Sequence, residues 1–337
     1  MKSGYKELLS KYSTLDFGDI NLQDEEQIFG GRLDHEMLNL CQLLPKSLQS
    51  NALLHIMQHF GGRLQPEIDI IRHYYYIPAW SIIYWLTLPN PGVLKLNDEE
   101  INQAITAHTM ALFLHAFDDH LTDGEIPVSH LALQLRSQSW ILMMDALYGL
   151  AIGIQGGPRI VDSLIDDYYS GIESNKKAVT LDEFGALFMK QMTTWMIVPI
   201  LLTKRATKND GFVDAIQSIF GSFGFAWRLL DDIKDIESDF NSSSESAIYI
   251  SLSDEMKKLW KPTSPGNLAE KNIRFETVMD YIVENRTIEK IVQRIIIELE
   301  SAASRAESIN MTGFARELAC LAQPLLKSMI KRHEILI

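Results

Sequence analysis

Residues 223–240 read FGFAWRLLDDIKDIESDF, an aromatic and aliphatic run that ends in a series of acids. Asp231, Asp235 and Asp239 follow one another at intervals of four residues, so a helix would place them on one face. Like charges at this spacing destabilise an isolated helix by about a few tenths of a kcal/mol per pair. The stripe therefore requires either open water or a counter-cation.

A second acid cluster occurs in HAFDDHLTDGE (115–125), after the apolar stretch AITAHTMALFLHAF (104–117). Asp119 and Asp123 share the four-residue spacing, and Asp118 lies beside them. Proteins commonly hold Mg²⁺ by one or two carboxylates together with substrate phosphates. Two acid-bearing helices that face one another would therefore clamp a diphosphate through Mg²⁺, which would stabilise the leaving oxygen as its C–O bond breaks.

Other kinds of site, or no site at all, would also place acids in a helical sequence. Two solvated helix ends would also explain the acids, although two copies after long apolar helices argue against it. Neither cluster has a glycine and a terminal glutamate at the spacing of a calcium-binding EF-hand loop. The Glu-x-x-His spacing of di-iron bundles is missing, as is the His-Asp dipeptide of metal-dependent phosphohydrolases.

The overall composition limits the class of protein. The chain has 337 residues, of which 46% are apolar, so it is long enough for one large domain or two ordinary ones. The net charge of -13 argues against a nucleic-acid or anionic membrane surface but leaves anionic ligands open, because metal ions reverse the local charge. Cys41 and Cys320 predict neither a disulfide scaffold nor a zinc site.

The N-terminal residues lack the apolar region of a signal peptide. The longest apolar runs, IPAWSIIYWLTL and WMIVPILL, are shorter than the roughly 18 residues that suggest a membrane span. We therefore expect a protein without a transmembrane segment, located in the cytoplasm.

Apolar residues recur at helical spacing along most of the chain. The pattern predicts helices over 33–45, 47–60, 66–87, 98–121, 128–152, 158–173, 180–204, 209–239, 244–260, 268–300 and 302–334. Breaks are expected at 88–93, 153–159, 207–211 and 261–267, where Gly, Pro and Asn gather. The sequence thus predicts one all-α domain over residues 1–337.

The paired acids resemble those of the class I isoprenoid synthases, the trans-prenyltransferases and the terpene synthases that share their fold. WRLLDDIKDIESD (227–239) is similar to the second prenyltransferase motif, FQxxDDxxD, with Trp227 and Arg228 in place of Phe and Gln. HTMALFLHAFDDHLTD (108–123) resembles the first motif, with its third acid displaced by one residue. Within MKQMTTWM (189–196), Lys190 best matches a family Lys-Thr pair.

The resemblance implies an isoprenoid synthase fold, a large helical bundle around a central cavity, and dependence on Mg²⁺. Three ions are implied, with Mn²⁺ as a substitute, and a homodimer is also implied. The implied metal ligands are Asp118, Asp119 and Asp123 in one cluster and Asp231, Asp232 and Asp235 in the other, with Asp239 in support. Of these, Asp118, Asp119 and Asp231 are the implied catalytic residues.

Two departures from the prenyltransferase pattern concern a second diphosphate. Chain-elongating enzymes carry GGKRxRP, whereas FGGRLQP (60–66) retains Arg63 and has Gly62 and Gln65 where basic residues are expected. After the first motif, no Arg precedes Arg136. The leading hypothesis is therefore a terpene synthase that ionises a C15–C20 allylic prenyl diphosphate and cyclises or rearranges the cation.

Two other functions stay open. One is a trans-prenyltransferase, either a polyprenyl diphosphate synthase or an enzyme that prenylates a non-isoprenoid acceptor. The other is a non-catalytic helical partner of an active synthase, although such a subunit would have little use for two complete acid clusters.

A carbocation must be kept from water in an aromatic-lined cavity. The leading candidates for that lining are Trp80, Phe113, Phe117, Phe188, Trp195 and Phe223, and further candidates are Tyr84, Trp85, Phe184 and Phe220. Aromatic residues at helical spacing are also ordinary core residues. The candidates for the departing diphosphate are Arg228, Lys190, Lys234 and Arg72. His115 lies four residues before Asp119 and could orient it, but a lone His on an apolar face is also typical of a helical core.

Overall fold

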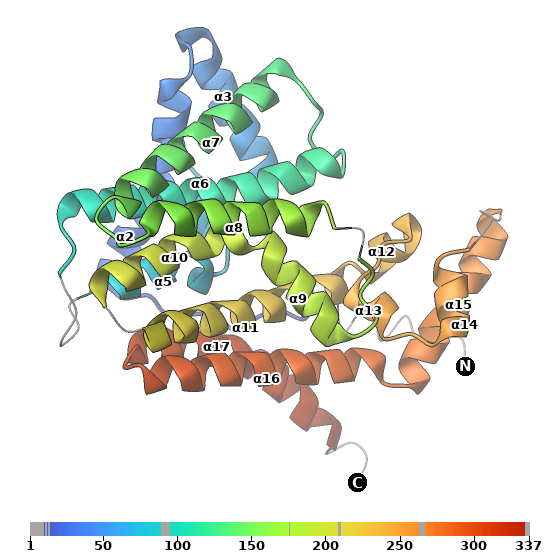
Figure 1. Ribbon diagram of the computed structural model, residues 1–337. Coiled ribbons are helices and arrows are strands. Elements are labelled where there is room, and N and C mark those ends of the chain that lie inside the picture. Colours follow the sequence, from blue (N-terminus) through green and yellow to red (C-terminus); the bar gives the residue numbers. More distant parts are fainter. Residues whose placement is uncertain are drawn as a thin grey trace.

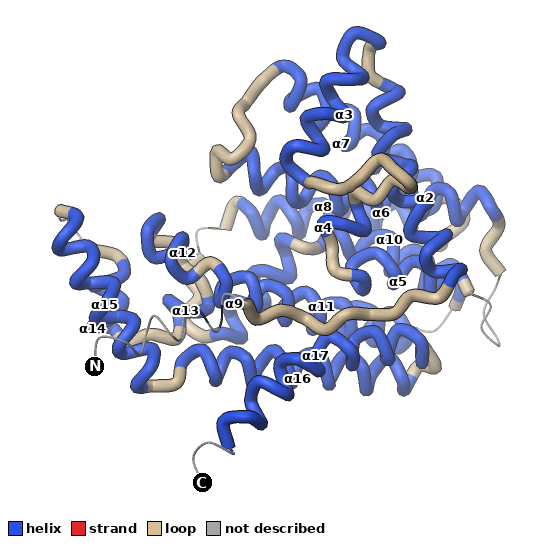
Figure 2. The backbone as a smooth tube through the Cα atoms, turned by 180° about the vertical axis from the view of Figure 1, so that it is seen from behind, coloured by secondary structure: helices blue, strands red, loops and turns tan. Residues whose placement is uncertain are grey.

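The computed structural model describes residues 10, 12, 14–88, 95–174, 176–207, 210–262 and 267–333, and every regular element in these ranges is a helix (Figures 1 and 2). The helices are α2 Asp24–Leu43, α3 Lys46–Phe60, α4 Ile71–Tyr74, α5 Ile77–Thr87, α6 Asp98–Thr122, α7 His130–Ala151, α8 Gly157–Ile172, α9 Leu181–Gln191, α10 Thr193–Ala206, α11 Asp210–Lys234, α12 Ile236–Ser242, α13 Ala247–Ile250, α14 Asp254–Trp260, α15 Leu268–Glu284, α16 Thr287–Ser308 and α17 Thr312–His333. The predicted all-α class is confirmed. The single domain over residues 1–337 stays a prediction, because both ends lie outside the described ranges.

Two helices of 25 residues each, α6 and α11, carry the acid clusters at their C-terminal ends. The start of α6 is fixed by a capping box, in which the Asn97 side chain accepts from the Glu100 N–H at 2.9 Å and the Glu100 carboxylate accepts from the Asn97 N–H at 2.8 Å. The helix packs against α2, α5, α7 and α10, while α11 packs against α9, α10 and α16. α6 is buried on most of its circumference, which holds its acidic end in place.

An extended segment, residues 14–23, runs behind this bundle and leads into α2 (Figure 2). The Gly18 N–H donates to the Leu321 carbonyl of α17 at 3.1 Å. Asp16 forms an ion pair with Lys234, the last residue of α11, at 3.1 Å. This segment therefore ties α17 to the end of α11.

The predicted helix over 66–87 is wrong in its first part. Residues 61–70 form a loop, and Tyr75 and Tyr76 have extended backbone between the short α4 and α5. Pro78 lies in the first turn of α5, where its missing N–H leaves no helical hydrogen bond unmade. The chain therefore starts a new helix here and does not continue the previous one.

Other predicted helices are divided or displaced. The predicted 180–204 helix is α9 and α10, bent by 71°, and the predicted 209–239 helix ends at Lys234 before α12 begins. The predicted 244–260 helix is α13 and α14. The last two turns fall at Arg286 and Asn310, which have φ of 54° and 63°. Neither position is Gly or Pro, although Asn310 is of a residue type that adopts positive φ more readily than most.

The expected break at 153–159 separates α7 from α8. The other expected breaks, at 88–93, 207–211 and 261–267, follow the ends of α5, α10 and α14, although residues 89–94, 208, 209 and 263–266 lie outside the described ranges. No single helix in the described ranges is both long and apolar enough to cross a membrane. α9 and α10 reach that length and hydropathy when taken together, but they are sharply bent and most of α10 is buried in the core.

A buried carboxyl group joins three helices on the far side of the core. Glu317 of α17 is 4% exposed and accepts hydrogen bonds from Ser81 and, at 2.6 Å, from the indole N–H of Trp85, both on α5. Glu26 of α2 also hydrogen-bonds to it. Burial raises the pKa of Glu317 to about 8, so the folded protein holds a proton there that the unfolded chain releases.

We expect the buried pair of acids, Glu317 and Glu26, to make the protein less stable as the pH rises. The pKa of Glu317 is higher in the folded protein than in the unfolded chain. Its contribution to the free energy of unfolding is therefore fully present below the pKa of the unfolded chain and is lost as the pH rises toward about 8. Glu317→Gln keeps a neutral side chain of the same shape, so its melting temperature should exceed that of the wild type by several degrees at pH 8 and by little at pH 5. Thermal unfolding of both proteins between pH 5 and 9 measures this, and parallel curves would contradict it.

Candidate functional site

Both acid clusters line one cavity of about 770 Å³, here called the acid cavity. The end of α6 supplies Asp119 and Asp123, and the chain from the end of α11 through α12 supplies Asp231, Asp232, Asp235 and Asp239. α9 and the segments around α8–α9 and α12–α13 complete the wall. The structure therefore brings together two clusters that lie more than 100 residues apart in the sequence.

Asp118 does not line this cavity, although the sequence grouped it with the metal ligands. Its carboxylate forms a two-point ion pair with the Arg136 guanidinium of α7, at 2.8 and 2.9 Å. Adjacent residues of a helix point about 100° apart, whereas residues four apart share a face. In this structure the Asp119–Asp123 pair is therefore the part of the first motif that faces the second.

The acids are held in an electrostatically unfavourable arrangement. Both clusters lie at helix C-termini, where the helix dipole already places partial negative charge. Burial, together with the negative charges of Asp235, Asp239 and Asp119, raises the pKa of Asp231 to about 6 against the lowering effect of Arg228. Burial and the charge of Asp119 likewise raise the pKa of Asp123. A cation between the clusters would relieve this repulsion.

Asp232 is buried and uses both carboxylate oxygens in protein contacts. One oxygen lies 3.0 Å from the Arg228 guanidinium, and the other accepts from the Ala247 N–H of α13 at 2.6 Å. Burial raises the pKa of Asp232 to about 7, while Arg228 lowers it. Asp232 is thus placed to hold Arg228 and α13, whereas Asp231 and Asp235 leave more of their carboxylate free.

Arg228 lies in the acid cavity, as the sequence predicted for a diphosphate contact. Its guanidinium is 3.7 Å from Asp231 and lies 5.9 Å from the ring centres of both Phe184 and Phe188 of α9. These two rings and Asp232 fix a cationic side chain at the boundary between the acids and the apolar wall.

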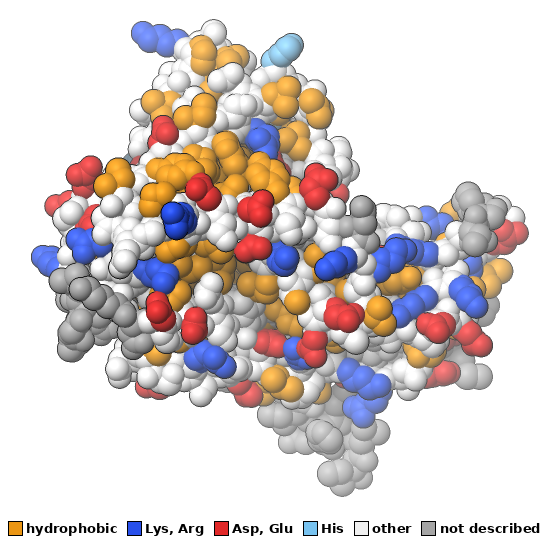
Figure 3. Space-filling model, in the orientation of Figure 1, with side chains coloured by type: hydrophobic (Ala, Val, Ile, Leu, Met, Phe, Trp, Pro, Cys, Tyr) orange, Lys and Arg blue, Asp and Glu red, His pale blue; other side chains and the backbone are white. Residues whose placement is uncertain are grey.

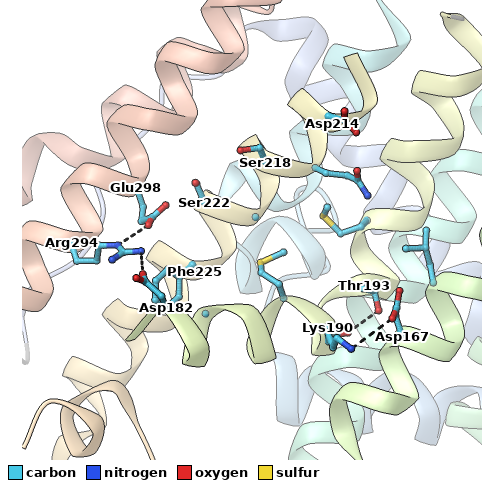
Figure 4. A pocket seen from close by; sticks show the side chains of 16 residues that line it. Asp167, Asp182, Lys190, Thr193, Asp214, Ser218, Ser222, Phe225, Arg294 and Glu298 are labelled. Carbon is cyan, nitrogen blue, oxygen red and sulfur yellow. Dashed lines mark hydrogen bonds and ion pairs between the residues drawn. The ribbon is translucent and has the colours of Figure 1, made fainter. Parts of the chain in front are cut away.

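The other three predicted diphosphate contacts lie elsewhere. Lys190 is on the opposite side of α9, in a shallow groove of about 620 Å³ between α8, α9, α11 and α16, where it is 4.0 Å from Asp167 (Figure 4). Lys234 is engaged by Asp16 and by the Tyr76 hydroxyl at 3.1 Å. Arg72 pairs with the buried Asp34 and donates to the Ile68 carbonyl at 2.6 Å.

The aromatic lining differs from the predicted set. Phe188 and Phe184, both candidates from the sequence, line the acid cavity together with Trp227, which was not a candidate. Five predicted members pack in the hydrophobic core, each at most 1% exposed: Trp80, Phe113, Phe117, Trp195 and Phe223. Trp195 lies directly behind the wall and stacks on Trp227 with ring centres 5.5 Å apart. The aromatic wall is therefore two layers deep.

His115 also lines the acid cavity and does not orient Asp119 by any hydrogen bond found in the structure. Its ring packs edge-on against Trp195, with centres 4.9 Å apart, and hydrogen-bonds to the backbone carbonyl of Gln191 at the end of α9. Burial, with a smaller contribution from the charge of Arg228, lowers the pKa of His115 to about 4. The imidazole is therefore neutral at pH 7.

Sequence reasoning missed several cavity residues. Lys176, in the loop between α8 and α9, lines the acid cavity, and nothing in its local sequence marks it. Tyr74 of α4 contacts His120 with its hydroxyl 2.8 Å from Nε2, and Nδ1 of His120 lies 3.4 Å from Glu125. These contacts link Tyr74, His120 and Glu125 along the rim of the cavity beside Asp119. Tyr74 is 46 residues from His120 in the sequence, so no local pattern indicated the contact.

The donor set fits Mg²⁺ bound together with phosphate. Within the described ranges, no three His, Cys, Asp or Glu side chains converge closely enough to hold a metal ion alone. Mg²⁺ is commonly held by one or two carboxylates, with water and phosphate oxygens completing its shell. Oxygen donors on two facing walls, with excess negative charge between them, suit ions that bridge to a bound diphosphate.

Comparison with solved structures shows the fold. The chain is similar to a geranylgeranyl pyrophosphate synthetase from Pyrococcus horikoshii Ot3, with a TM-score of 0.58, 11% identity and coverage of 94% of this chain and 98% of that one. A polyprenyl synthetase from Streptomyces coelicolor A3(2) has the same TM-score of 0.58, with 14% identity and coverage of 90% of this chain and 98% of that one. A decaprenyl diphosphate synthase from Rhodobacter capsulatus also has a TM-score of 0.58, with 13% identity and coverage of 96% of this chain and 99% of that one.

No protein-family model matches the sequence, and a search of curated proteins finds no match. The structural similarity extends over nearly the whole length of each compared chain at low sequence identity. The chain therefore has the all-α isoprenoid synthase fold, as its two aspartate-rich motifs predicted.

Proposed function

We propose that the acid cavity binds an allylic prenyl diphosphate with Mg²⁺ and breaks its C–O bond, so that the protein is an enzyme of the prenyltransferase kind. The observation that carries the proposal is the placement of Asp119 and Asp123 opposite Asp231 and Asp235 in one cavity. The fold shared with prenyl diphosphate synthases supports it.

The proposed roles follow from position in the cavity. Asp119, Asp123, Asp231 and Asp235 would hold the Mg²⁺ ions, with Asp239 in support. When bound, the metal supplies the positive charge that stabilises the leaving oxygen. Arg228 and Lys176 bind the diphosphate, and Asp232 positions Arg228. Phe184, Phe188 and Trp227 exclude water and present ring faces to the carbocation.

Transfer of the prenyl group to an acceptor is the first candidate for the fate of the cation, because the similar structures are named as prenyl chain synthases. They favour transfer over the cyclisation that the sequence led us to expect. Cyclisation, or transfer to an acceptor without a diphosphate, is the second candidate. A specific observation favours this second candidate. The described residues that line the cavity include two basic side chains, Lys176 and Arg228, and two bound diphosphates would need more positive charge than these supply.

Arg63, the residue retained from the basic family motif, does not add to these cations. Its guanidinium pairs with Asp69 at 2.6 Å, and its side chain is 71% exposed outside the acid cavity. A non-catalytic partner subunit is the least favoured function, because unligated acids at two helix ends cost stability without a compensating ligand.

Product analysis tests the proposal and separates its two candidates. Purified protein would be incubated with Mg²⁺ and geranyl, farnesyl or geranylgeranyl diphosphate, each with and without isopentenyl diphosphate. Products would be identified by gas chromatography with mass detection, before and after phosphatase treatment. A longer prenyl alcohol that requires both isopentenyl diphosphate and phosphatase supports transfer, and a hydrocarbon or terpene alcohol from one allylic diphosphate supports cyclisation. Absence of diphosphate release from all three substrates would contradict the proposal.

Lys176→Ala is expected to weaken substrate binding. Lys176 lines the cavity and forms no ion pair with another described residue, so its ammonium is free to contact a diphosphate. We expect KM to rise by about tenfold, with a smaller change in kcat. Its neighbour Lys177, which pairs with Glu245 at 3.4 Å, provides the control Lys177→Ala. Steady-state kinetics of both variants decides the matter, and equal KM values for Lys176→Ala and wild type would refute the contact.

The homodimer and the cytoplasmic location stay predictions. Apolar side chains that a partner subunit would cover are exposed on one face over α7 and α8 (Figure 3). They are Leu133, Ile141, Tyr148, Ile152, Tyr169 and Ile172.

A further inference from the structure

His115 occupies the boundary between the aromatic wall and the acids. It lies on α6, one turn before Asp119, and its ring borders the acid cavity. The Trp195 ring centre is 4.9 Å away and the Trp227 ring centre 6.5 Å away. A hydrocarbon chain whose diphosphate lies between the acid clusters would therefore extend past this imidazole.

The environment of His115 leaves one basic nitrogen available. One ring nitrogen hydrogen-bonds to the Gln191 carbonyl and so carries the proton of the neutral imidazole. The other ring nitrogen of His115 then carries a lone pair that can accept a proton, and the imidazole borders the cavity. If that nitrogen gains a proton, the existing bond to the carbonyl stabilises the imidazolium, because a charged donor forms a stronger hydrogen bond.

The neighbouring groups are less suited to accept a proton from the hydrocarbon. His120, the other histidine among the described lining residues, is engaged by Tyr74 and Glu125 at the rim. The carboxylates belong to the two clusters proposed to hold Mg²⁺, and the released diphosphate, the other base in the cavity, would have its charge neutralised by the same ions and by Arg228. Phe184, Phe188 and Trp227 offer ring faces without a basic atom. His115 is thus a neutral base at the apolar end of the cavity, and a weak base suffices because protons next to a carbocation are strongly acidic.

We propose that His115 is the general base that ends the reaction of the carbocation. This inference rests on the proposed function. The C–O bond of the allylic diphosphate breaks and its electron pair leaves with the diphosphate. An alkene, within the same molecule or in an acceptor, supplies the electrons of the new C–C bond. A C–H bond next to the resulting cation then breaks, its electron pair forms a C=C bond, and its proton passes to the free nitrogen of His115.

His115→Gln tests this role, because the Gln amide can still donate to the Gln191 carbonyl but has no basic nitrogen. The measurement compares released diphosphate with deprotonated product and with alcohol formed by water capture, using the allylic diphosphate that the wild type consumes. We expect deprotonated product per diphosphate to fall by about tenfold or more, with alcohol making up the difference.

The matched control is His108→Gln, on the same helix. His108 is also buried and neutral, with its pKa lowered to about 4 by burial, but it binds the Ala79 carbonyl at 2.7 Å in the core and does not line the cavity. Its product ratio should equal that of the wild type. His115→Asn serves as a second variant if the circular dichroism of His115→Gln departs from that of the wild type.

Two failures are distinguishable. A wild type that turns over, together with His115 variants that keep the wild-type ratio of deprotonated product to alcohol, would overturn the base while leaving the proposed function intact. A wild type that releases no diphosphate from any allylic substrate would overturn the proposed function and this inference together.

Discussion

Replacement of Asp119 by Asn is expected to lower kcat/KM for diphosphate release by about 10³-fold or more, with the fold unchanged. Asp119 faces the second cluster across the acid cavity, and its negative charge is one of the causes that raise the pKa of Asp231. An amide keeps the shape of the side chain and removes the charge that would bind Mg²⁺. Release of diphosphate from an allylic substrate at saturating Mg²⁺ measures the effect.

Asp118→Asn is the matched control, because it makes the same change one residue earlier. Asp118 is turned toward Arg136 outside the cavity, so we expect a change in kcat/KM of less than about fivefold. Loss of a partly buried, two-point ion pair should instead lower the free energy of unfolding by about 1–3 kcal/mol. Urea denaturation gives this value, and equal kinetic losses in the two variants would show that both acids act in the first cluster.

Arg228→Gln is expected to produce the second large effect, a fall in kcat/KM of about 10²-fold. Arg228 is held between Asp232 and the rings of Phe184 and Phe188, so its guanidinium is positioned before the substrate arrives. A donor fixed in this way stabilises the charge that develops on the departing diphosphate.

Arg228→Lys separates charge from geometry. Lysine keeps the positive charge but loses the planar, two-point hydrogen bonding, so it should recover only part of the loss. Steady-state kinetics of both variants, with thermal unfolding as the check on folding, measures this. A kcat/KM near that of the wild type in Arg228→Gln would mean that the diphosphate binds elsewhere.

The parts of the site that follow helical periodicity could be predicted from the sequence. Spacing of four residues predicted that Asp119 with Asp123, and Asp231 with Asp235, would face the same way, and the long apolar runs before them predicted buried helices. Arg228 could be predicted because it interrupts such a run close to the acids. These features depend on contacts within one helix, which the sequence specifies directly.

Features that depend on contacts between distant segments could not be predicted. Lys234 lies within the second acid motif and Arg72 lies in the helix predicted over 66–87, but ion pairs with Asp16 and Asp34 hold the two basic side chains outside the acid cavity. The aromatic residues were predicted as buried, yet burial alone does not distinguish a cavity wall from the core behind it. Lys176 lies in a loop, where no periodicity indicates the direction of a side chain.

The measurement that tests the site most directly is a crystal structure of the protein with Mn²⁺ and the thiolodiphosphate analogue of the allylic substrate it consumes. Mn²⁺ stands in for Mg²⁺ and can be located by its anomalous scattering, and the sulfur resists cleavage. We predict Mn²⁺ peaks that bridge the diphosphate to Asp119 or Asp123 on one side and to Asp231 or Asp235 on the other, with Arg228 in contact with the phosphate oxygens. A diphosphate bound outside the acid cavity, or metal ions on one cluster alone, would contradict the proposal.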